Sequence, residues 1–219
     1  MKNIKKTNIT VALPKGRLAD KAIAILEKCG LDCSTLKIYT RQLILQDGKK
    51  SMNFIFVKPS DVPTYVERGS ADFGFVGKDT LLEENKDIYE PVDLKMGACY
   101  MAVAGYPNFN YEKLAHKLCV ATKYVRIAKE YFNKKGIDVD IIKLNGSVEL
   151  GPLIGLSDVI VDLVESGKTL EANGLVPLEK ICEITARMIV NKVSLKTKGE
   201  VLTPLIAQIK SVVNEGGKK

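Results

Sequence analysis

The chain has 219 residues, of which 46% are hydrophobic and 27% are charged, so it is long enough for one large domain or two smaller ones with ordinary hydrophobic cores. No apolar run approaches the length of a membrane span, and the basic N-terminus leads into a short strand pattern rather than a signal peptide, so we expect a cytoplasmic protein without a membrane partner. The net charge of +7 lies partly in the lysine-rich tails, and with 6% aromatic residues and no Trp we expect no nucleic-acid partner.

Nucleophilic and metal-ligating side chains are scarce. The single histidine, His116, lies near two lysines and is interpreted as a surface residue. The five cysteines are an odd number without a C-x-x-C pair, and we interpret them as small core residues rather than as metal or disulfide ligands. They are Cys29, Cys33, Cys99, Cys119 and Cys182. An enzyme of this composition would act by positioning and electrostatics.

The first predicted strand, residues 9–13, ends in a Pro-Lys-Gly-Arg turn. Leu18, Ala22 and the apolar residues one turn later then mark one face of a helix. Lys15 and Arg17 thus stand between a strand and a helix, where α/β folds place ligand-binding groups. The alternative interpretation is an exposed basic turn without a function.

The next segments predict further strands and helices. Residues 54–57 form a strand pattern, and a capping residue precedes a helix over residues 62–67. The segment 71–79 is predicted as a strand whose glycines mark the close approach of another backbone or of a ligand. Asp79 is predicted to cap the helix that follows it.

The middle of the chain begins with an apolar run, residues 94–105, which we predict to be one strand that crosses into a second lobe. A strand over residues 118–121 follows, and Thr122 is predicted as the N-cap of a helix that runs through Phe132. Tyr124 lies at the mouth of that helix. It could stack on a purine or pack on its own lobe, and the local sequence favours neither.

Acids, a glycine and hydroxyls come together in residues 149–175. Val-Ile-Val at 159–161 predicts a buried strand, and Asp158 and Asp162, four residues apart, lie on one face of it. Ser-Gly-Lys-Thr at 166–169 then forms a turn before a helix, where backbone N–H groups, hydroxyls and the helix dipole favour an anion. One interpretation is a site for a phosphate with a ribose diol or a bound Mg²⁺. The other is a buried strand and an N-cap flanked by solvated acids.

Three further elements complete the predicted chain. Residues 141–144 form a strand pattern before the acid-rich segment. Residues 181–193 are apolar enough to run back to the first lobe. A terminal helix over about residues 200–213, with apolar residues at helical spacing, completes that lobe.

The segment 149–175 resembles the signature of ATP phosphoribosyltransferase, the enzyme that opens histidine biosynthesis. The matching positions are Glu149, Gly155, Ser157, Ile160, Asp162, Leu163, Ser166, Gly167, Thr169 and Leu170. Ser166 stands where Thr is more usual and keeps the hydroxyl donor, and Gly151 stands where Ala is common. Leu-Pro-Lys-Gly-Arg-Leu at 13–18 resembles the N-terminal motif of the same family. The resemblance covers nearly the whole chain and is to the short form, which lacks a C-terminal regulatory domain.

This resemblance implies a fold and a domain organisation. The fold would be α/β and two-lobed, periplasmic-binding-protein-like (type II), with crossing strands that join the lobes and a ligand between them. We therefore expect residues 1–94 and 185–219 to form the first lobe. Residues 95–184 would form the second lobe, which carries the phosphate loop.

The resemblance also implies site residues. Those for phosphoribosyl pyrophosphate (PRPP) would be Glu149, Asp158, Asp162, Ser166, Gly167, Lys168, Thr169 and Leu170. Tyr124, Lys15 and Arg17 would bind ATP, while Lys15, Arg17 and Arg41 would be the catalytic cations that draw off the leaving pyrophosphate. The implied cofactor is Mg²⁺, carried by the substrate without direct protein ligation, apart from Asp162 as the one protein contact considered.

The implied reaction is attack of ATP N1 on the anomeric carbon of PRPP, which gives N1-(5-phospho-β-D-ribosyl)-ATP and pyrophosphate. The implied assembly is a hetero-octamer, in which the catalytic chain associates with itself and with a histidyl-tRNA-synthetase-like regulatory subunit. Two alternatives stay open. One is a non-catalytic two-lobed binding or sensor protein for a phosphorylated metabolite, which leaves the acid-rich strand unexplained. The other is a salvage phosphoribosyltransferase for a free base, which does not predict the motif at 13–18.

Overall fold

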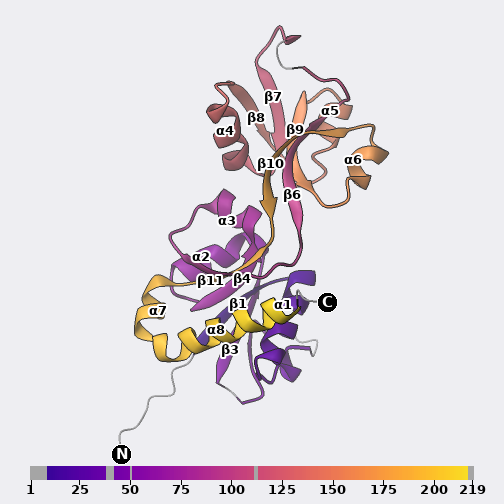
Figure 1. The fold of residues 1–219 in the computed structure, drawn as a ribbon. Coiled ribbons are helices and arrows are strands. Elements are labelled where there is room, and N and C mark those ends of the chain that lie inside the picture. The colour runs from indigo at the N-terminus through magenta and orange to yellow at the C-terminus, as the bar shows by residue number, and fades with distance from the viewer. Residues whose placement is uncertain (1–8, 38–41, 50, 111–112, 217–219) are drawn as a thin grey trace, which may run out of the picture. The chain divides into compact units, whose positions relative to one another are not determined.

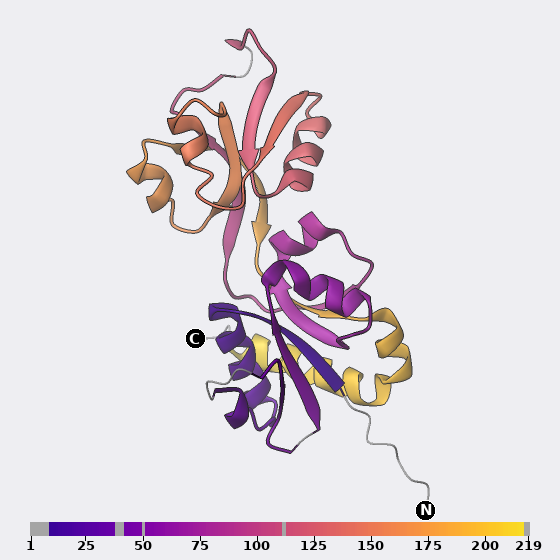
Figure 2. The same cartoon turned by 180° about the vertical axis from the view of Figure 1, so that it is seen from behind.

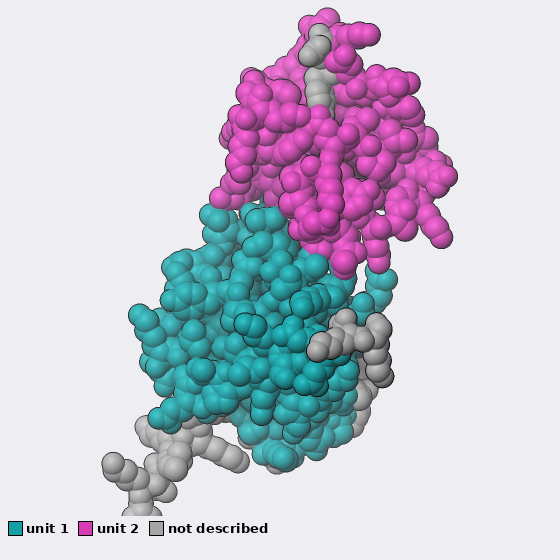
Figure 3. Space-filling model, viewed as in Figure 1, with its two compact units in different colours: residues 1–97, 185–219 teal, residues 98–184 magenta. Residues whose placement is uncertain are grey.

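The structure, a computed structural model, describes residues 9–37, 42–49, 51–110 and 113–216. The chain divides into two compact units (Figure 3): unit 1 comprises residues 1–97 and 185–219, and unit 2 comprises residues 98–184. Each unit has its own sheet flanked by helices, as Figures 1 and 2 show. The predicted α/β class is therefore confirmed.

Unit 1 is built on a six-stranded sheet in the order β2-β3-β1-β4-β11-β5. Its strands are β1 (Ile9–Pro14), β2 (Ile44–Gln46), β3 (Met52–Val57), β4 (Phe73–Gly77), β5 (Tyr89–Asp93) and β11 (Ala186–Val190). β1 pairs in parallel with both β3 and β4, while β2 and β11 run antiparallel to their neighbours. Three parallel strands therefore end at one edge of this sheet.

Alternation along the strands gives unit 1 three layers. Its helices are α1 (Arg17–Lys28), η1 (Ser34–Lys37), η2 (Pro59–Asp61), α2 (Val62–Glu67), α3 (Lys78–Glu84), α7 (Lys192–Thr197) and α8 (Gly199–Gly216). In β1, Val11 and Leu13 lie in a core with α1 and α8, whereas Ala12 lies in a second core with α2 and α3. The sheet is thus covered on both faces.

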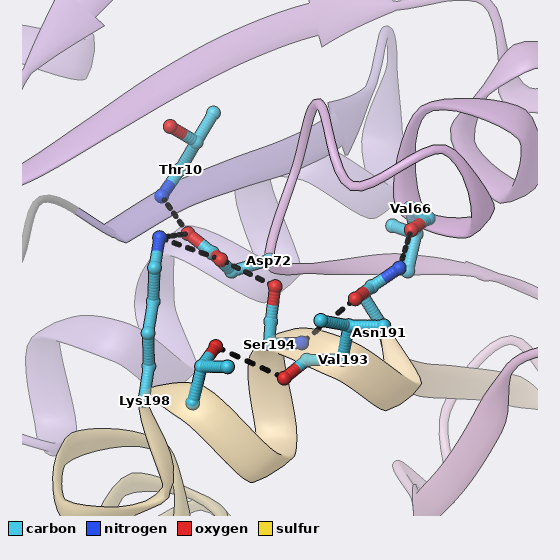
Figure 4. Close-up of polar contacts among 8 residues, drawn as sticks. Thr10, Val66, Asp72, Asn191, Val193, Ser194 and Lys198 are labelled. Atoms are coloured by element: carbon cyan, nitrogen blue, oxygen red, sulfur yellow. Dashed lines mark hydrogen bonds and ion pairs between the residues drawn. The ribbon is translucent and has the colours of Figure 1, made fainter.

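A polar network fastens α7 to this sheet (Figure 4). Asp72, 3% exposed, accepts hydrogen bonds from the Thr10 N–H (2.8 Å) and the Ser194 hydroxyl (2.6 Å), and it forms an ion pair with Lys198 (2.8 Å). Asn191 caps α7 by accepting from the Ser194 N–H, and its amide donates to the carbonyl end of α2. A buried carboxylate is costly unless it is paired and hydrogen-bonded, so these contacts hold the C-terminal helices in one place.

Gly74 of β4 confirms the predicted close approach. A Cβ at this position would lie 2.8 Å from the Ala12 carbonyl oxygen and 3.0 Å from the Val62 side chain. The close neighbour is therefore the backbone of β1 beneath α2, and it leaves no room for a side chain.

Unit 2 is built on a five-stranded sheet in the order β10-β6-β9-β7-β8. Its elements are β6 (Cys99–Gly105), β7 (Leu118–Thr122), α4 (Val125–Lys134), β8 (Val139–Lys143), α5 (Leu150–Leu153), β9 (Val159–Val164), α6 (Lys168–Ala172) and β10 (Val176–Ile184). β7 pairs in parallel with both β8 and β9. β6 runs antiparallel to β9, and β10 runs antiparallel to β6. Figure 1 shows α4 and α6 on opposite sides of this sheet.

We predicted a single strand over residues 94–105, and this prediction is wrong. β5 ends at Asp93 in unit 1, and β6 begins at Cys99 in unit 2. Between them Lys95 (φ 53°) and Gly97 (φ 64°) take left-handed conformations, which break an extended chain. Apolar composition alone could not reveal this turn.

Two predicted helix caps are also corrected. The N-cap of α3 is Gly77, and Asp79 lies in the first turn of that helix. Thr122 ends β7, so the N-cap position of α4 falls to Tyr124. In both helices the N-cap lies two residues from the residue whose side chain suggested a cap.

The interpretation of the cysteines as core residues holds in part. All five cysteines carry thiols and are not joined by disulfides. Cys33 is fully buried, whereas the other four are half-buried. The return run predicted at residues 181–193 is divided among β10, β11 and the start of α7.

Candidate active site

The parallel strands of unit 2 bring several predicted site residues to one edge. The register aligns Thr122 of β7 with Lys143 of β8 and with Val161 of β9, so the carboxyl ends of the three strands meet there. The segments that leave this edge carry Tyr124, Glu149 and the loop after β9. Such edges are where α/β folds bind ligands, because loops and helix N-termini gather at them.

The loop after β9 leads through Gly167 into α6. Gly167 is the N-cap of the helix, and its φ of 75° is a left-handed conformation that glycine adopts without strain. Ser166, Lys168 and Thr169 are exposed, whereas Leu170 is buried and anchors the helix in the apolar core. The first N–H groups of a helix have no acceptor within it. The loop therefore offers backbone donors, two hydroxyls and an ammonium group to an anion.

Asp162 lies near the loop end of β9. Ile160 and Val164, its neighbours on the same strand face, belong to the apolar cluster that also contains Leu170. The Asp162 side chain is half-buried, and its Oδ1 accepts the Leu163 N–H at 2.8 Å. A carboxylate thus stands on the α6 side of the sheet, two residues before the strand ends.

Glu149 reaches the same region from the segment after β8. It is the half-buried N-cap residue of α5, and Val148 before it is buried in the cluster with Ile160 and Leu170. One apolar cluster of unit 2 therefore anchors the segments that carry Glu149, Asp162 and the loop. This common anchor brings together residues that lie up to about 20 positions apart in the chain.

Asp158 is placed elsewhere, which corrects the prediction that it shares a site with the loop at 166–169. It precedes β9, and its carboxylate accepts the Cys119 N–H (2.7 Å) and contacts His116 Nε2 (3.1 Å) at the amino end of β7. Roughly 13 Å of strand separates it from Asp162. The spacing of four residues therefore does not bring the two acids to one edge: Asp158 precedes β9, whereas Asp162 lies near its carboxyl end.

Tyr124 is buried within unit 2, with 5% of its surface exposed. The Lys123 ammonium lies 5.5 Å from the centre of its ring. This burial favours the interpretation in which the ring packs on its own unit over the one in which it stacks on a purine. The side chain that this turn presents to solvent is that of Lys123.

Unit 1 has a corresponding edge where β1, β3 and β4 end. The Lys15 N–H donates to the Val57 carbonyl (2.9 Å), and Gly16, with φ 105°, leads to Arg17 at the start of α1. The side chains of Lys15 and Arg17 are exposed. Lys58, also exposed, follows β3 at the same edge. Sequence reasoning missed it because a single lysine in a loop carries no signal until strand pairing places it beside the end of β1.

Two further predictions concern cations and catalytic side chains. Arg41 lies outside the described residues. Within the described ranges, no three His, Cys, Asp or Glu side chains gather so that they could hold a metal ion.

Burial, with the carboxylates of Asp140 and Asp158, raises the pKa of the Cys119 thiol, which makes it a poor nucleophile.

Comparison with known proteins now assigns this arrangement to a family. The HisG family model, ATP phosphoribosyltransferase, matches residues 58–211. The ATP phosphoribosyltransferase of Caldanaerobacter subterraneus subsp. tengcongensis is 53% identical over 208 residues, which are 95% of this chain and 99% of that relative. The chain belongs to the ATP phosphoribosyltransferase family. It is therefore an enzyme of the glycosyltransferase class that acts at the first step of histidine biosynthesis.

Solved structures give the same assignment. An ATP phosphoribosyl transferase (HisG:HisZ) complex from Thermotoga maritima matches with a TM-score of 0.82 and 35% identity, over 94% of this chain and 99% of that one. The aliphatic sulphonate binding protein SsuA from Escherichia coli matches with a TM-score of 0.60 over 94% of this chain and 72% of that one, and at 12% identity this likeness shows the fold alone. The predicted two-lobed, periplasmic-binding-protein-like fold is confirmed.

The comparisons also decide between the alternatives that the sequence left open. Family membership favours the ATP phosphoribosyltransferase over a non-catalytic sensor and over a salvage enzyme for a free base. Within the described part of the chain, no helix combines the length and the apolar character that crossing a membrane requires.

Proposed function

We propose that the chain transfers the phosphoribosyl group of PRPP to N1 of ATP in a Mg²⁺-dependent reaction. The N1 lone pair forms a bond to the anomeric carbon, while the bond from that carbon to the pyrophosphate oxygen breaks. Pyrophosphate leaves with the bonding electron pair, and N1-(5-phospho-β-D-ribosyl)-ATP is the other product. The observation that carries the proposal is the carboxyl edge of unit 2, where Asp162 and the exposed loop at 166–169 share one apolar anchor.

Unit 2 would bind the phosphoribosyl part of PRPP. The backbone N–H groups that open α6, with the side chains of Ser166, Lys168 and Thr169, would hold the 5-phosphate. Asp162 and Glu149 would accept hydrogen bonds from the ribose hydroxyls and stabilise the positive charge that develops on the ring as pyrophosphate departs. Adenine N1 is already nucleophilic, so the chain needs no general base for this step. It would accelerate the reaction through placement and preorganised charge.

Unit 1 would handle the other charges. The exposed Lys15 and Arg17 at the carboxyl end of β1 are the proposed partners of the ATP phosphates and of the departing pyrophosphate. Arg41 is proposed for the same role from the family resemblance. Lys58 joins this set because β3 ends beside β1. For ATP, the turn at Tyr124 in unit 2 remains the proposed neighbour of the adenine.

The oxygen ligands of this site suit a Mg²⁺ ion that is bound to the substrate phosphates when the substrate enters. Mg²⁺ prefers oxygen ligands and commonly takes them from phosphates, with one or two carboxylates from the protein. The described residues offer no complete cage for a metal. Asp162 lies in β9 between Ile160 and Val164, which belong to the apolar cluster that also contains Leu170 of α6. When bound, Mg²⁺ would neutralise charge on the diphosphate. Asp162 would help to orient the substrate that carries it.

We infer that the chain works in an assembly. The matched structure from Thermotoga maritima is a HisG:HisZ complex. By this likeness we propose a histidyl-tRNA-synthetase-like regulatory subunit in a cytoplasmic hetero-octamer, with self-association of the catalytic chain. Gel filtration of the chain alone and with that subunit should show a larger species only in the mixture. Full activity of the isolated chain that histidine inhibits would contradict the need for the partner.

An activity assay tests the reaction itself. The chain, with and without the regulatory subunit, is mixed with ATP, PRPP and MgCl₂, and product absorbance and pyrophosphate release are followed together. We expect one pyrophosphate for each ATP consumed. Binding of PRPP without pyrophosphate release would contradict the proposed chemistry. Release with free adenine in place of ATP would identify a salvage enzyme instead.

A further inference from the structure

Thr122 stands at the junction of two segments of the proposed site. It is the last residue of β7 and is fully buried, with 0% of its surface exposed. Its hydroxyl donates to the Val161 carbonyl at 2.6 Å and accepts the Tyr124 N–H at 2.8 Å. Both polar functions of the hydroxyl are therefore used, and each is used by a different segment.

The contact with Val161 lies where the pairing of β7 and β9 ends. The register between these two fully described strands runs from Val120 and Val159 to Thr122 and Val161, and it goes no further. Beyond this point the register of β9 continues with β6, where Asp162 pairs with Ala102. The Thr122 hydroxyl thus supplies the last link between β7 and β9. It holds the peptide bond that leads directly into Asp162.

The contact with Tyr124 fixes the turn that opens α4. Tyr124 has φ −104° and ψ 67°, outside the helical region, and its carbonyl accepts the Ala128 N–H at 3.0 Å. Because the Tyr124 N–H is bound to the Thr122 hydroxyl, the turn cannot shift without breaking a buried hydrogen bond. One hydroxyl therefore links the turn proposed for ATP to the strand position proposed for PRPP.

We propose that Thr122 is a positioning residue for the transferase reaction, whose hydroxyl sets the place of Asp162 relative to the turn at Tyr124. This inference rests on the proposed function, in which Asp162 binds the ribose of PRPP. Removing the hydroxyl leaves a buried carbonyl and a buried N–H without their partner, and the end of β9 is then free to relax. The resulting misplacement of Asp162 weakens the binding of PRPP more than that of ATP.

Three variants separate this role from simple stabilisation. Thr122→Val keeps the shape of the side chain and removes the hydroxyl, and Thr122→Ser keeps the hydroxyl. Val120→Ala shortens a fully buried side chain two residues earlier in β7 and leaves the hydroxyl in place. Thr122→Ala replaces the Val variant if the latter does not fold. The KM for PRPP, the KM for ATP, kcat and the Kd for PRPP from calorimetry are measured for each full-length chain with its regulatory subunit.

We expect Thr122→Val to raise the KM and Kd for PRPP about tenfold, the equivalent of one buried hydrogen bond, with a smaller change for ATP. Thr122→Ser should bind PRPP like the wild type, and Val120→Ala should lose thermal stability without losing PRPP affinity. Equal losses in Thr122→Val and Val120→Ala would overturn the inference, as would a failure of Ser to restore binding. Asp162→Asn separates a failure of this inference from a failure of the proposed site. If Asp162→Asn weakens PRPP binding and Thr122→Val does not, only the inference about Thr122 fails. If Asp162→Asn has no effect on PRPP binding, the proposed site itself is contradicted.

Discussion

The carboxyl edges of the two units share one backbone plan and differ in charge. In each, three parallel strands end together, and a glycine with a positive φ leads from a strand into a helix: Gly16 (φ 105°) before α1 and Gly167 (φ 75°) before α6. The edge in unit 1 exposes the cations Lys15 and Arg17. The edge in unit 2 combines the Asp162 carboxylate with a loop of hydroxyl and N–H donors. The fold thus supplies two equivalent places, and the side chains decide what each can bind.

The amino edges of the sheets serve another purpose. In unit 1 the amino ends of β1 and β4 carry the Asp72 network, and in unit 2 the amino ends of β7 and β9 carry the contacts of Asp158. Both carboxylates accept hydrogen bonds from groups of the protein itself. The comparison therefore predicts that acids at the amino edges contribute to stability, and that acids at the carboxyl edge of unit 2 contribute to catalysis.

The largest effect is expected from substituting Asp162, which lies in β9. Asp162→Asn should lower kcat/KM for PRPP about 10²-fold or more, because an interaction made with developing charge is lost. Asp158→Asn is the matched control, at the acid that directly precedes the same strand. It should leave kcat/KM nearly unchanged and lower the melting temperature, because its carboxylate accepts the Cys119 N–H. Steady-state kinetics and thermal unfolding of both variants check this. Equal losses of kcat/KM would contradict the claim that acids at the two edges of the sheet have different roles.

The next effect concerns stability at the amino edge of unit 1. Asp72→Asn should lower the free energy of unfolding by about 2 kcal/mol, because the buried ion pair with Lys198 is lost while part of the hydrogen bonding survives. The kinetics of the folded enzyme should not change, since Asp72 lies away from the carboxyl ends of the strands. Urea unfolding measures the loss.

Asp87→Asn serves as the control for that variant. Asp87 forms an ion pair with Lys192, the first residue of α7, but the Asp87 side chain is 81% exposed. Water screens such a pair, so the cost should be well below that of Asp72→Asn. A loss in Asp87→Asn as large as that in Asp72→Asn would show that burial at the amino edge is not what gives the network its strength.

These two edges also show how far the sequence could predict the molecule. The helix over residues 62–67 was predicted with the bounds that α2 has, because its cap, its proline and the glycine after it are local signals. The loop at 166–169 was found for the same reason. What failed was the placement of Asp158: a period of two tells which face of a strand a residue occupies, but not which edge of the sheet lies nearby.

Contacts between distant segments lay beyond the sequence altogether. The Thr122 hydroxyl meets Val161 across 39 positions, and Asp72 meets Lys198 across 126. Neither pair has a local pattern, because the strand order that joins them is set by the packing of whole layers. Thr122 was predicted as a helix cap for its hydroxyl; that hydroxyl accepts the Tyr124 N–H before α4, and it also links β7 to β9 through the Val161 carbonyl.

A smaller effect is expected from pH, through a carboxylate away from the carboxyl edge of its own sheet. Asp47 closes the turn between β2 and β3. Burial alone would raise the pKa of Asp47, but hydrogen bonds from the Met52 N–H (2.8 Å), the Ser51 hydroxyl (2.7 Å) and the Ser51 N–H (2.6 Å) outweigh it and lower the pKa. A lowered folded-state pKa means that the stabilisation is complete above the unfolded value and is lost as pH falls through the folded value.

Asp47→Asn tests this titration. At pH 7 it should lower the free energy of unfolding by about 1.5 kcal/mol, and the difference from the wild type should shrink below about pH 4, where the unfolded carboxyl binds its proton. Urea unfolding at a series of pH values measures it. A difference that stays constant down to the acid limit would show that shape, and not charge, is what Asp47 contributes.

The smallest effect is expected from alanine substitutions at the two glycines on either side of α6. Gly167 (φ 75°) and Gly174 (φ 69°) flank α6, and a Cβ would meet nothing closer than 4.0 Å at Gly167 and nothing within 4 Å at Gly174. Alanine at either position should therefore cost about 1 kcal/mol of backbone strain and little else. Because the loss of stability is matched, any difference in PRPP binding reports on the loop. Gly167→Ala should weaken the calorimetric Kd for PRPP a few-fold and Gly174→Ala should not; equal affinities in the two variants would mean that the turn before α6 does not hold the phosphate.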